Sequence, residues 1–319
     1  MRWIKARGVF ATVVSGVAAL LPLIADPFDG GPLVRYVPAT LSQAYAYSLV
    51  VSADSAPGPA RKWIAEGQAA LLDAAPLELP AELTLNAGAR ATDATAYRLS
   101  GRLGRRLSVH VAVPSENASD LFVELFESGP STFEPIISVP AQASGEETAF
   151  QYVWHGLRDA ELVLRVQTAL GYEGPIEVRV EESPLLAFPV AGHGARSIQS
   201  GFGAERDGGR RAHRGVDIFA DRGTEVLASM DGWVVRVDTT PRGGNVVWFQ
   251  PMHGNLRLYY AHLDTQLVSQ GDFVLQGDVL GTVGNTGNAI TTPPHLHYGV
   301  YLRRRGRRGG ARDPVDFLL

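Results

Sequence analysis

Apolar and polar residues recur along this chain with two different periods, which mark a short helix and a long strand-rich region. In residues 60–74, apolar side chains such as Trp63, Ile64 and Leu71 recur at helical spacing with charged residues between them, so we expect an amphipathic helix that ends before Pro76. In residues 77–184 the apolar period becomes two, which predicts β-strands. The clearest runs are 107–113, 162–166 and 176–180. Turns rich in Gly, Pro and Asn separate these runs, as in an antiparallel β-sandwich.

The last part of the chain, residues 185–319, follows a Pro-rich break and is also strand-like, but it contains far more glycine. Alternating runs at 233–237, 245–249, 256–260 and 296–302 are separated by glycine turns. The whole pattern predicts a mainly β protein, in which a short helix and a β-sandwich-like accessory domain precede a compact antiparallel β catalytic domain. With 319 residues, the chain is long enough for two such domains.

The first 25 residues have the composition of an export segment. Three basic residues stand near the start, and an apolar run continues to Ala25. The run has about the minimum length for a membrane span, and Leu23 stands where a cleavage site prefers a small residue. A cleaved signal peptide and an uncleaved N-terminal membrane anchor therefore both stay open. Either one places the body of the protein in the cell envelope, periplasmic or secreted.

Composition limits the available chemistry. A formal net charge of -4 gives no overall attraction to nucleic acid, and we expect none as a partner. The absence of cysteine excludes disulfides, thiolate metal sites and a cysteine nucleophile, so histidine and the carboxylates remain as the strong metal ligands. Residues 26–76 are expected to form a linker that includes the short helix. Its first part, 26–59, is rich in Pro, Gly, Ala and Ser and is interpreted as a connector to which the sequence assigns no conformation.

Short histidine clusters in the C-terminal region carry the candidate chemistry. In the first cluster, Gly215 disfavours a helix between His213 and Asp217, and in an extended backbone these two side chains project to the same side. In the last cluster, His295 and His297 are two residues apart, so both rings face one side of a strand. One carboxylate and several imidazoles can therefore meet at one ion.

Zinc is the metal that best fits two neutral imidazoles and one carboxylate, because calcium and magnesium require mostly oxygen ligands. Three protein ligands leave a position for water, whose pKa falls toward about 7 on the ion, and such a site hydrolyses amides. The histidines that are not ligands can orient water or stabilise the oxyanion. His262, another histidine of this region, ends a further predicted strand.

The order of these motifs along the chain is far more specific than any one of them. The set comprises His213-x-x-x-Asp217, Tyr259-Tyr260-Ala261-His262-Leu263, His295-x-His297 and the framework segments Phe202-Gly203, Gly223-Thr224, Asp231-Gly232, Gly284-Asn285-Thr286-Gly287 and Asp313-Pro314. It resembles the lysostaphin and LytM type of zinc metallopeptidase, peptidase family M23, over about residues 185–319. One departure is that the family often has a histidine soon after the strand at 246–249, whereas three other residues precede His253 here.

The resemblance implies a small antiparallel β-domain with the metal in a groove. It also implies that Zn²⁺ is bound by His213, Asp217 and His297, and that His262 and His295 assist catalysis. The residues alone do not separate His295 from His297 as the ligand. That assignment comes from the family, and the other histidines of the chain are expected to be packed or exposed.

We therefore expect a zinc-dependent endopeptidase that hydrolyses peptide bonds in bacterial peptidoglycan, with metal-bound water as nucleophile. Its expected partners are peptidoglycan peptides and, through the N-terminal segment, the inner membrane. The alternatives are a non-catalytic activator of other cell-wall hydrolases and a general secreted protease. The β-sandwich is expected to position or shield the groove. The arginine-rich run 303–308 is interpreted as a solvated hairpin turn in preference to a patch that binds an anionic polymer.

Overall fold

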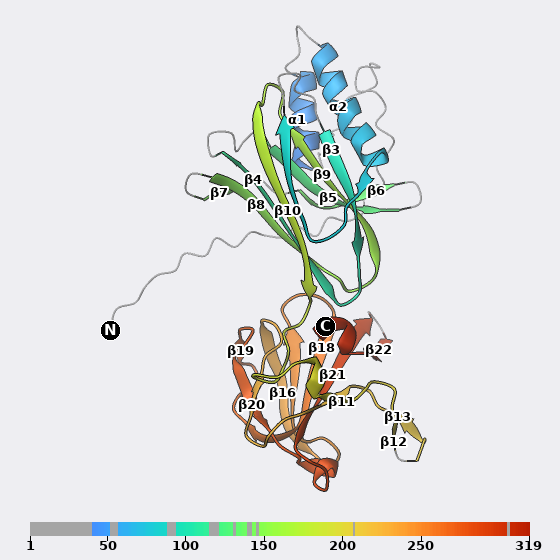
Figure 1. Cartoon of the computed structure of the whole chain (residues 1–319), viewed down its shortest axis with the longest axis vertical. Coiled ribbons are helices and arrows are strands. Elements are labelled where there is room, and N and C mark those ends of the chain that lie inside the picture. The colour runs from blue at the N-terminus through green and yellow to red at the C-terminus, as the bar shows by residue number, and fades with distance from the viewer. Residues whose placement is uncertain are drawn as a thin grey trace, which may run out of the picture.

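The computed structural model describes residues 40–51, 57–87, 94–114, 121–129, 132–138, 142–144, 147–206, 208–304 and 307–319. These residues form two β bodies, one above the other in Figure 1, with two helices beside the upper one. The mainly β fold that the pattern predicted is confirmed. The expected export segment lies outside the described residues, and no helix among those described is long and apolar enough to cross a membrane.

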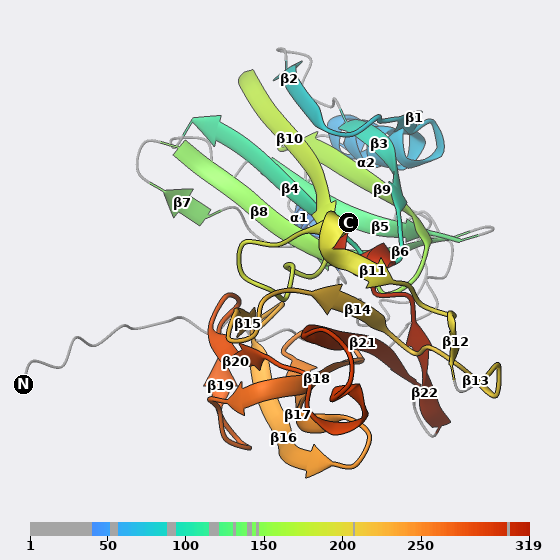
Figure 2. The same cartoon turned by 60° about the horizontal axis from the view of Figure 1, so that its bottom comes forward.

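The N-terminal body is a sandwich of two five-stranded sheets, seen from below in Figure 2. One sheet has the order β1-β3-β9-β5-β6 and the other the order β2-β10-β4-β8-β7. Neighbouring strands are antiparallel, except for the short parallel pair of β1 and β3. The strands are β1 (Ala75–Pro76), β2 (Ala81–Ala87), β3 (Ala94–Gly101), β4 (Arg105–Pro114), β5 (Leu121–Ser128), β6 (Phe133–Ser138), β7 (Gln142–Ser144), β8 (Glu147–His155), β9 (Ala160–Thr168) and β10 (Gly174–Pro184).

The alternating runs of the sequence lie where the sandwich needs them. In β10, the side chains of Ile176, Val178 and Val180 are buried between the sheets, and the residues between them are exposed. Such alternation is expected for a strand with one face on the core and one in water. In β9, by contrast, every residue from Leu162 to Thr168 is buried. The second face of β9 must therefore be covered by something other than a sheet.

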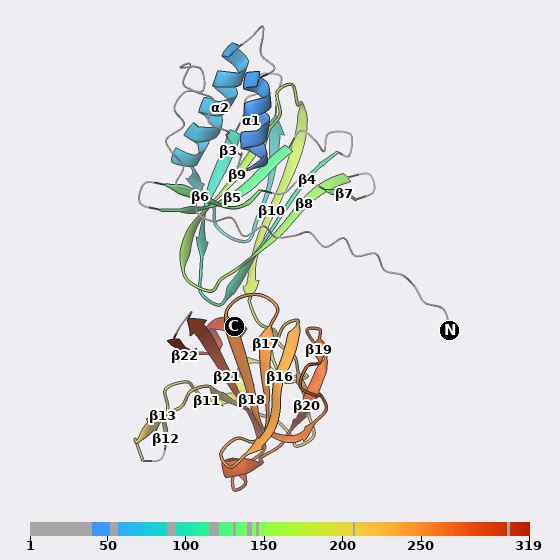
Figure 3. The same cartoon turned by 180° about the vertical axis from the view of Figure 1, so that it is seen from behind.

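Two helices cover that face, α1 (Leu41–Val51) and α2 (Pro57–Leu72), as Figures 1 and 3 show. The expected helix at 60–74 corresponds to α2, which begins three residues earlier. The connector expected at 26–59, to which the sequence assigned no conformation, includes α1. This helix has no charged face to mark it in the sequence, and it is stabilised by packing, for example of Tyr45 against Trp63 with ring centroids 5.1 Å apart.

A buried ion pair joins both helices to the sheet. Arg165 of β9 donates from Nε to Glu124 of β5 at 3.1 Å and from Nη1 to the Gly67 carbonyl of α2 at 2.9 Å. The hydroxyl of Ser42 in α1 donates to Glu124 at 2.7 Å. Buried charges are tolerated only when they are paired and hydrogen-bonded in this way. Arg165 thus occupies a position that apolar periodicity could not assign to either face.

The C-terminal body is built on a ten-stranded sheet with the path β11-β14-β21-β18-β17-β16-β19, and Figure 3 shows its central strands. Strands β15, β20 and β22 join off this path, and β12 and β13 form a separate hairpin. The elements are η2 (Ala195–Ser197), β11 (Ile198–Ser200), β12 (Glu205–Arg206), β13 (Arg211–Ala212), β14 (Val216–Phe219), β15 (Glu225–Leu227), β16 (Gly232–Thr240), β17 (Gly244–Pro251), β18 (Leu256–Gln266), β19 (Phe273–Val274), β20 (Val279–Val283), η3 (Gly287–Ala289), β21 (His295–Arg304), β22 (Arg307–Arg312) and α3 (Val315–Leu318). The four strand runs expected here lie within β16, β17, β18 and β21.

The arginine-rich run lies between paired strands. Arg304 at the end of β21 is opposite Arg307 at the start of β22, and the two strands are antiparallel. Residues 305 and 306 lie outside the described part. The pairing on both sides is the arrangement that the hairpin interpretation requires.

The two bodies meet directly after β10. Leu185 and Leu186 are buried in the C-terminal core, and the amide of Leu186 donates to the Phe317 carbonyl at 2.9 Å. Beside this junction, His155 of β8 stacks on His253 of the C-terminal body, with ring centroids 4.9 Å apart and planes 16° apart. His253, whose position departs from the resembled family, therefore lies at the junction of the two bodies.

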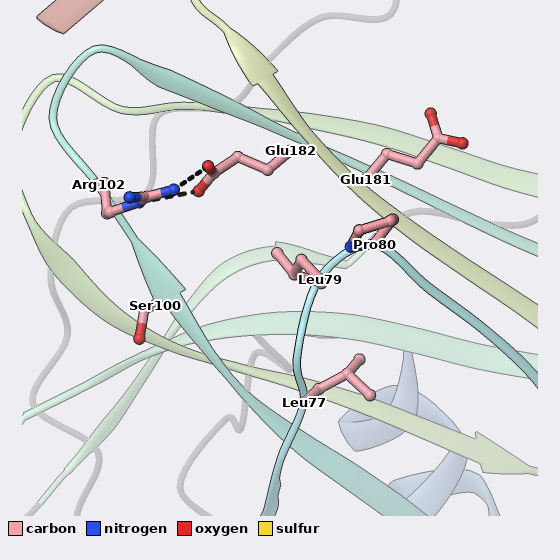
Figure 4. A pocket seen from close by; sticks show the side chains of 7 residues that line it. All are labelled: Leu77, Leu79, Pro80, Ser100, Arg102, Glu181 and Glu182. Carbon is pink, nitrogen blue, oxygen red and sulfur yellow. Dashed lines mark hydrogen bonds and ion pairs between the residues drawn. The ribbon is translucent and has the colours of Figure 1, made fainter.

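The sandwich also has a hollow of its own, of about 680 Å³, beside the ends of β3 and β10. Figure 4 shows that its polar part is dominated by the pair of Arg102 and Glu182, in which Nε donates to the carboxylate at 3.2 Å. The remaining lining residues are Leu77, Leu79, Pro80, Ser100 and Glu181. Glu182 is already paired with Arg102, and none of the described lining residues is a histidine, so the hollow offers no set of ligands for a metal ion.

We predict that the stacked pair at the junction makes stability sensitive to acid. Burial, and then the neighbouring His253 and Arg106, lower the pKa of His155 from 6.5 to about 4. In the unfolded chain the His155 ring takes up a proton below about pH 6.5, but in the folded chain it does so only near pH 4. The contribution of the neutral His155 to stability is therefore fully present above pH 6.5 and is lost as the pH falls toward 4. In His155→Gln, the melting temperature should fall less steeply between pH 7 and pH 4.5 than in the unmodified protein.

The matched control is His193→Gln, because that imidazole is exposed. It should keep the full pH dependence. An unchanged slope in His155→Gln would show that the junction does not contribute to acid sensitivity.

Candidate metal centre and groove

Three neighbouring strands bring the predicted metal ligands together. Strand β14 pairs with β21, which pairs with β18, and in this register Asp217 lies opposite His297, which lies opposite Ala261. Residues directly opposite each other on paired strands project from the same face of the sheet. His213 follows β13 and precedes β14, so its ring reaches the same place from the end of the hairpin.

The ligand atoms of His213, Asp217 and His297 form a tight triangle. Nε2 of His213 lies 3.0 Å from Oδ1 of Asp217, and Nδ1 of His297 lies 2.9 Å from the same oxygen. The two nitrogens are 2.9 Å apart. This is the single group of three or more such side chains found within the described residues that could hold a metal ion. Of the two histidines that the sequence left open, the structure brings His297 into this group.

The hydrogen bonds around the triangle fix the chemistry of its atoms. Nδ1 of His213 lies 2.9 Å from the Gly201 carbonyl, which can only accept, so the proton of the neutral ring is on Nδ1. Nε2 then presents a lone pair toward Asp217 and His297. Nη2 of Arg206 also lies 3.1 Å from Nδ1, but it donates instead to Oδ2 of Asp217 at 2.7 Å.

Three electron-rich atoms at this separation require a cation among them, either a proton or a metal ion. Ligands bound at about 2.0 Å in a tetrahedron lie about 3.3 Å apart, which is close to the spacing seen here. A histidine whose second ring nitrogen donates to a backbone carbonyl is also the usual arrangement for a metal ligand. The residues present therefore fit a small divalent cation such as zinc.

The protonation states agree with a ligand set. Burial opposes the ionisation of Asp217, but hydrogen bonds and charge from His213 and His297 outweigh it, so the pKa of this carboxyl lies far below its ordinary value. Burial lowers the pKa of His297, although its contact with Asp217 works in the opposite direction. At neutral pH the group thus offers a carboxylate and a neutral imidazole.

The other two predicted residues, His262 and His295, lie beside the triangle. Their ring centroids are 5.1 Å apart, and that of His262 is 6.0 Å from that of His297. Nδ1 of His262 donates to the Thr286 carbonyl at 2.8 Å and Nδ1 of His295 to the Pro293 carbonyl at 2.9 Å, so in each neutral ring Nε2 is the proton acceptor. Burial is the main cause that lowers the pKa of His262 to about 4, and this ring is neutral at pH 7.

His262 reaches the groove through an irregular backbone. Tyr260 of β18 is fully buried in the core and Ala261 lines the groove, so regular alternation would turn the next side chain back into the core. Instead His262 has a φ of 62°, in the left-handed region, and its side chain also lines the groove. Its amide donates to the Gly243 carbonyl at 2.8 Å, which holds this conformation. Strained residues of this kind concentrate at functional sites.

The groove that contains all five residues has a volume of about 460 Å³. Its lining residues are Ser200, Arg206, Arg211, His213, Asp217, Phe219, Arg242, Gly243, Tyr259, Ala261, His262, Asn288, Ala289, Thr292, His295 and His297. All of them belong to the C-terminal body. The described residues of the β-sandwich thus contribute no side chain to the groove that the sandwich was expected to shield.

Sequence reasoning missed the arginines of this groove. Arg206 contacts Asp217 and also donates to the hydroxyl of Ser200 at 2.5 Å, while Arg211 and Arg242 line the cavity. The one available signal was their position, three residues after Phe202-Gly203 for Arg206 and in a glycine turn for Arg242. Nothing in that spacing distinguishes a groove arginine from an exposed one.

A family model described as peptidase family M23 matches residues 211–314. This segment of the chain is a peptidase M23 domain.

Proteins of known function share this M23 domain. The L-Ala–D-Glu endopeptidase of Bacillus subtilis is 36% identical over 140 residues, which are 41% of this chain and 42% of that protein. The peptidoglycan DD-endopeptidase ShyC of Vibrio cholerae is 39% identical over 108 residues, 32% of this chain and 24% of that protein. Among solved structures, the catalytic domain of lysostaphin from Staphylococcus simulans is 33% identical, with 37% of this chain and 87% of that chain covered and a TM-score of 0.33. The chain spans less than half the length of both curated relatives.

The matched segment of the M23 domain contains the triangle and both accompanying histidines, whereas Ser200 and Arg206 precede it. The glycine between the first two ligands also lies inside the match. A Cβ on Gly215 would lie 2.3 Å from the Tyr298 carbonyl oxygen and 2.9 Å from Cε1 of His297. The absence of a side chain at this position is what lets the His297 ring lie beside the first cluster.

We predict that Gly215→Ala displaces His297 and weakens the metal centre of the M23 domain. Overpacking of this kind costs about 1–3 kcal/mol, and the ring must move to relieve it. Zinc content measured by atomic absorption should fall well below one ion per chain, and the melting temperature should decrease. Gly194→Ala is the matched control, because a Cβ there meets nothing within 4 Å and the residue is extended. Full zinc loading in Gly215→Ala would contradict the role assigned to this glycine.

Proposed function

We propose that this protein is a zinc-dependent endopeptidase that hydrolyses peptide bonds in bacterial peptidoglycan. The observation that carries the proposal is the convergence of His213, Asp217 and His297 within 3.0 Å, beside two more histidines in one groove. A zinc ion bound there would act as a Lewis acid and lower the pKa of water. The ligands would be Nε2 of His213, a carboxylate oxygen of Asp217 and Nδ1 of His297.

The chain's own residues would move the protons. His262 is neutral, and its Nε2 accepts a proton because Nδ1 is engaged by the Thr286 carbonyl. In this role it removes a proton from the attacking water and later returns it to the leaving nitrogen. His295, fixed in the same way by the Pro293 carbonyl, is placed to share this transfer or to stabilise the developing oxyanion.

Peptidoglycan is the proposed substrate because ShyC, a curated relative of the M23 domain, is named a peptidoglycan DD-endopeptidase. An enzyme with this substrate must act in the cell envelope. The positive, apolar N-terminal segment supports such a location, as a signal peptide or as an anchor in the inner membrane. A non-catalytic activator, the rival function, would need no metal ligands. The groove nonetheless brings three candidate ligands together.

The metal requirement is tested by removing one ligand charge. Asp217→Asn should reduce zinc content and should lower hydrolysis of purified peptidoglycan by about 10³-fold or more, because the site loses its only anionic ligand. Chelation of the unmodified protein should have the same effect, with recovery on addition of zinc. Mass spectrometry of released peptides measures the hydrolysis. Cleavage that survives chelation would refute the zinc mechanism. The folding control is the Tm of Asp217→Asn, which should be close to that of the unmodified zinc-free protein.

Proton transfer is tested separately from metal binding. His262→Gln should lower kcat on peptidoglycan peptides by about 10²–10⁴-fold while zinc content stays near one ion per chain, because the residue transfers protons and is not a ligand. A His193→Gln protein, altered at an exposed imidazole far along the chain, serves as control. If His262→Gln lost its zinc as well, the division between ligands and proton-transfer residues would be wrong.

A further inference from the structure

The groove is strongly unbalanced in charge. Three guanidinium groups, those of Arg206, Arg211 and Arg242, line it, and the single carboxylate among its described lining residues is Asp217. That carboxylate is already engaged by Arg206 and by the two ligand histidines. The groove would become more positive still with a divalent cation bound. A neutral substrate would leave the Arg242 guanidinium without a carboxylate partner among the described residues.

We propose that these arginines make the groove selective for peptides that carry a free carboxylate next to the scissile bond, over neutral peptides such as glycine chains. The inference rests on the proposed peptidase function and narrows its substrate class. Arginine forms two parallel hydrogen bonds to a carboxylate, which gives both affinity and orientation. Positive potential concentrated in a cleft also speeds the approach of an anionic ligand.

One wall of the groove holds Arg242 on a fixed backbone. The carbonyl of Arg242 accepts from the Asn288 amide at 3.1 Å, and the adjacent Gly243 carbonyl accepts from the His262 amide at 2.8 Å. A Cβ on Gly287 would lie 2.6 Å from the same Arg242 carbonyl oxygen, so the turn and η3 are in close contact. Within the described part of the chain, the Arg242 guanidinium has no carboxylate partner. Its backbone is therefore preorganised beside the proton-transfer histidine, and its charge is available to a ligand.

The other wall holds Arg206 and Arg211 on the β12–β13 hairpin, which projects from the C-terminal body in Figure 1. Backbone bonds attach the base of this hairpin to His213, whose amide donates to the Ala204 carbonyl at 2.8 Å and whose carbonyl accepts from the Gly203 amide at 2.9 Å. Both walls are thus attached to catalytic or ligand residues. A substrate carboxylate held by either wall would have a defined position relative to the reacting carbonyl.

Three peptides test the inference on the full chain with zinc. The first is L-Ala–γ-D-Glu–L-Lys–D-Ala with a free α-carboxyl on D-Glu, the second is the same peptide with that carboxyl amidated, and the third is pentaglycine. We expect kcat/KM to be at least about ten-fold higher for the acid than for its amide, with most of the difference in KM, and pentaglycine to be the poorest substrate.

The arginine itself is tested with Arg242→Gln. This change should lower kcat/KM for the acid about ten-fold, while kcat/KM for the amide stays within about two-fold of that of the unmodified protein. The preference for the acid then disappears. Arg236→Gln is the matched control, because Arg236 is paired with Asp238 on β16 and does not line the groove. Arg211→Gln, on the other wall, provides a second variant if Arg242→Gln is unstable.

Binding gives a readout that does not depend on hydrolysis. Fluorescence anisotropy of the labelled acid and amide on chelated protein should show tighter binding of the acid, reduced in Arg242→Gln. Equal cleavage of acid and amide, or a preference for pentaglycine, would overturn the charge selectivity and leave the peptidase function intact. Failure to cleave any peptide or whole peptidoglycan would refute the peptidase function, and anisotropy would then decide the charge selectivity by itself.

Discussion

Three electron-rich ligand atoms within 3.0 Å of one another form an arrangement that the rest of the C-terminal domain must hold in place. Without a cation they would repel, so their position has to be fixed by the surrounding fold. The register of β14 with β21 sets Asp217 opposite His297, the missing side chain at Gly215 makes room for the ring, and the Gly201 carbonyl fixes the tautomer of His213. Each constraint is backbone geometry, which a rigid sheet provides at low entropic cost.

Much of this arrangement could be predicted from the sequence because it depends on strand alternation. Asp217 and His297 lie on regular strands, and the period of two gives the side to which each one points. His262 differs, because its approach to the groove depends on a φ of 62° that a histidine seldom adopts and that no glycine marks. Its role could be expected only from the family resemblance.

The N-terminal part shows the same limit in another form. The helix α1 and the fully buried strand β9 depend on each other: the strand carries Arg165 toward the helices, and Ser42 of α1 completes the polar network around Glu124. Neither element has an amphipathic pattern by which it could be identified alone, since its second face is defined by the partner. Periodicity identifies an element whose two faces differ in polarity, whereas α1 has no charged residue and β9 is buried on both faces from Leu162 to Thr168.

The arginines that we propose to favour an anionic substrate would also oppose a bound metal ion. A guanidinium 2.7 Å from Oδ2 of Asp217 competes for part of the single negative charge in the ligand set, and like charges in a partly enclosed groove raise the cost of holding a divalent ion. A carboxylate on the substrate would offset this repulsion. Substrate and metal would then each stabilise the binding of the other, as thermodynamic linkage requires whenever one ligand relieves a cost that the other pays. In such a groove, charge selectivity and metal retention are two consequences of one electrostatic balance.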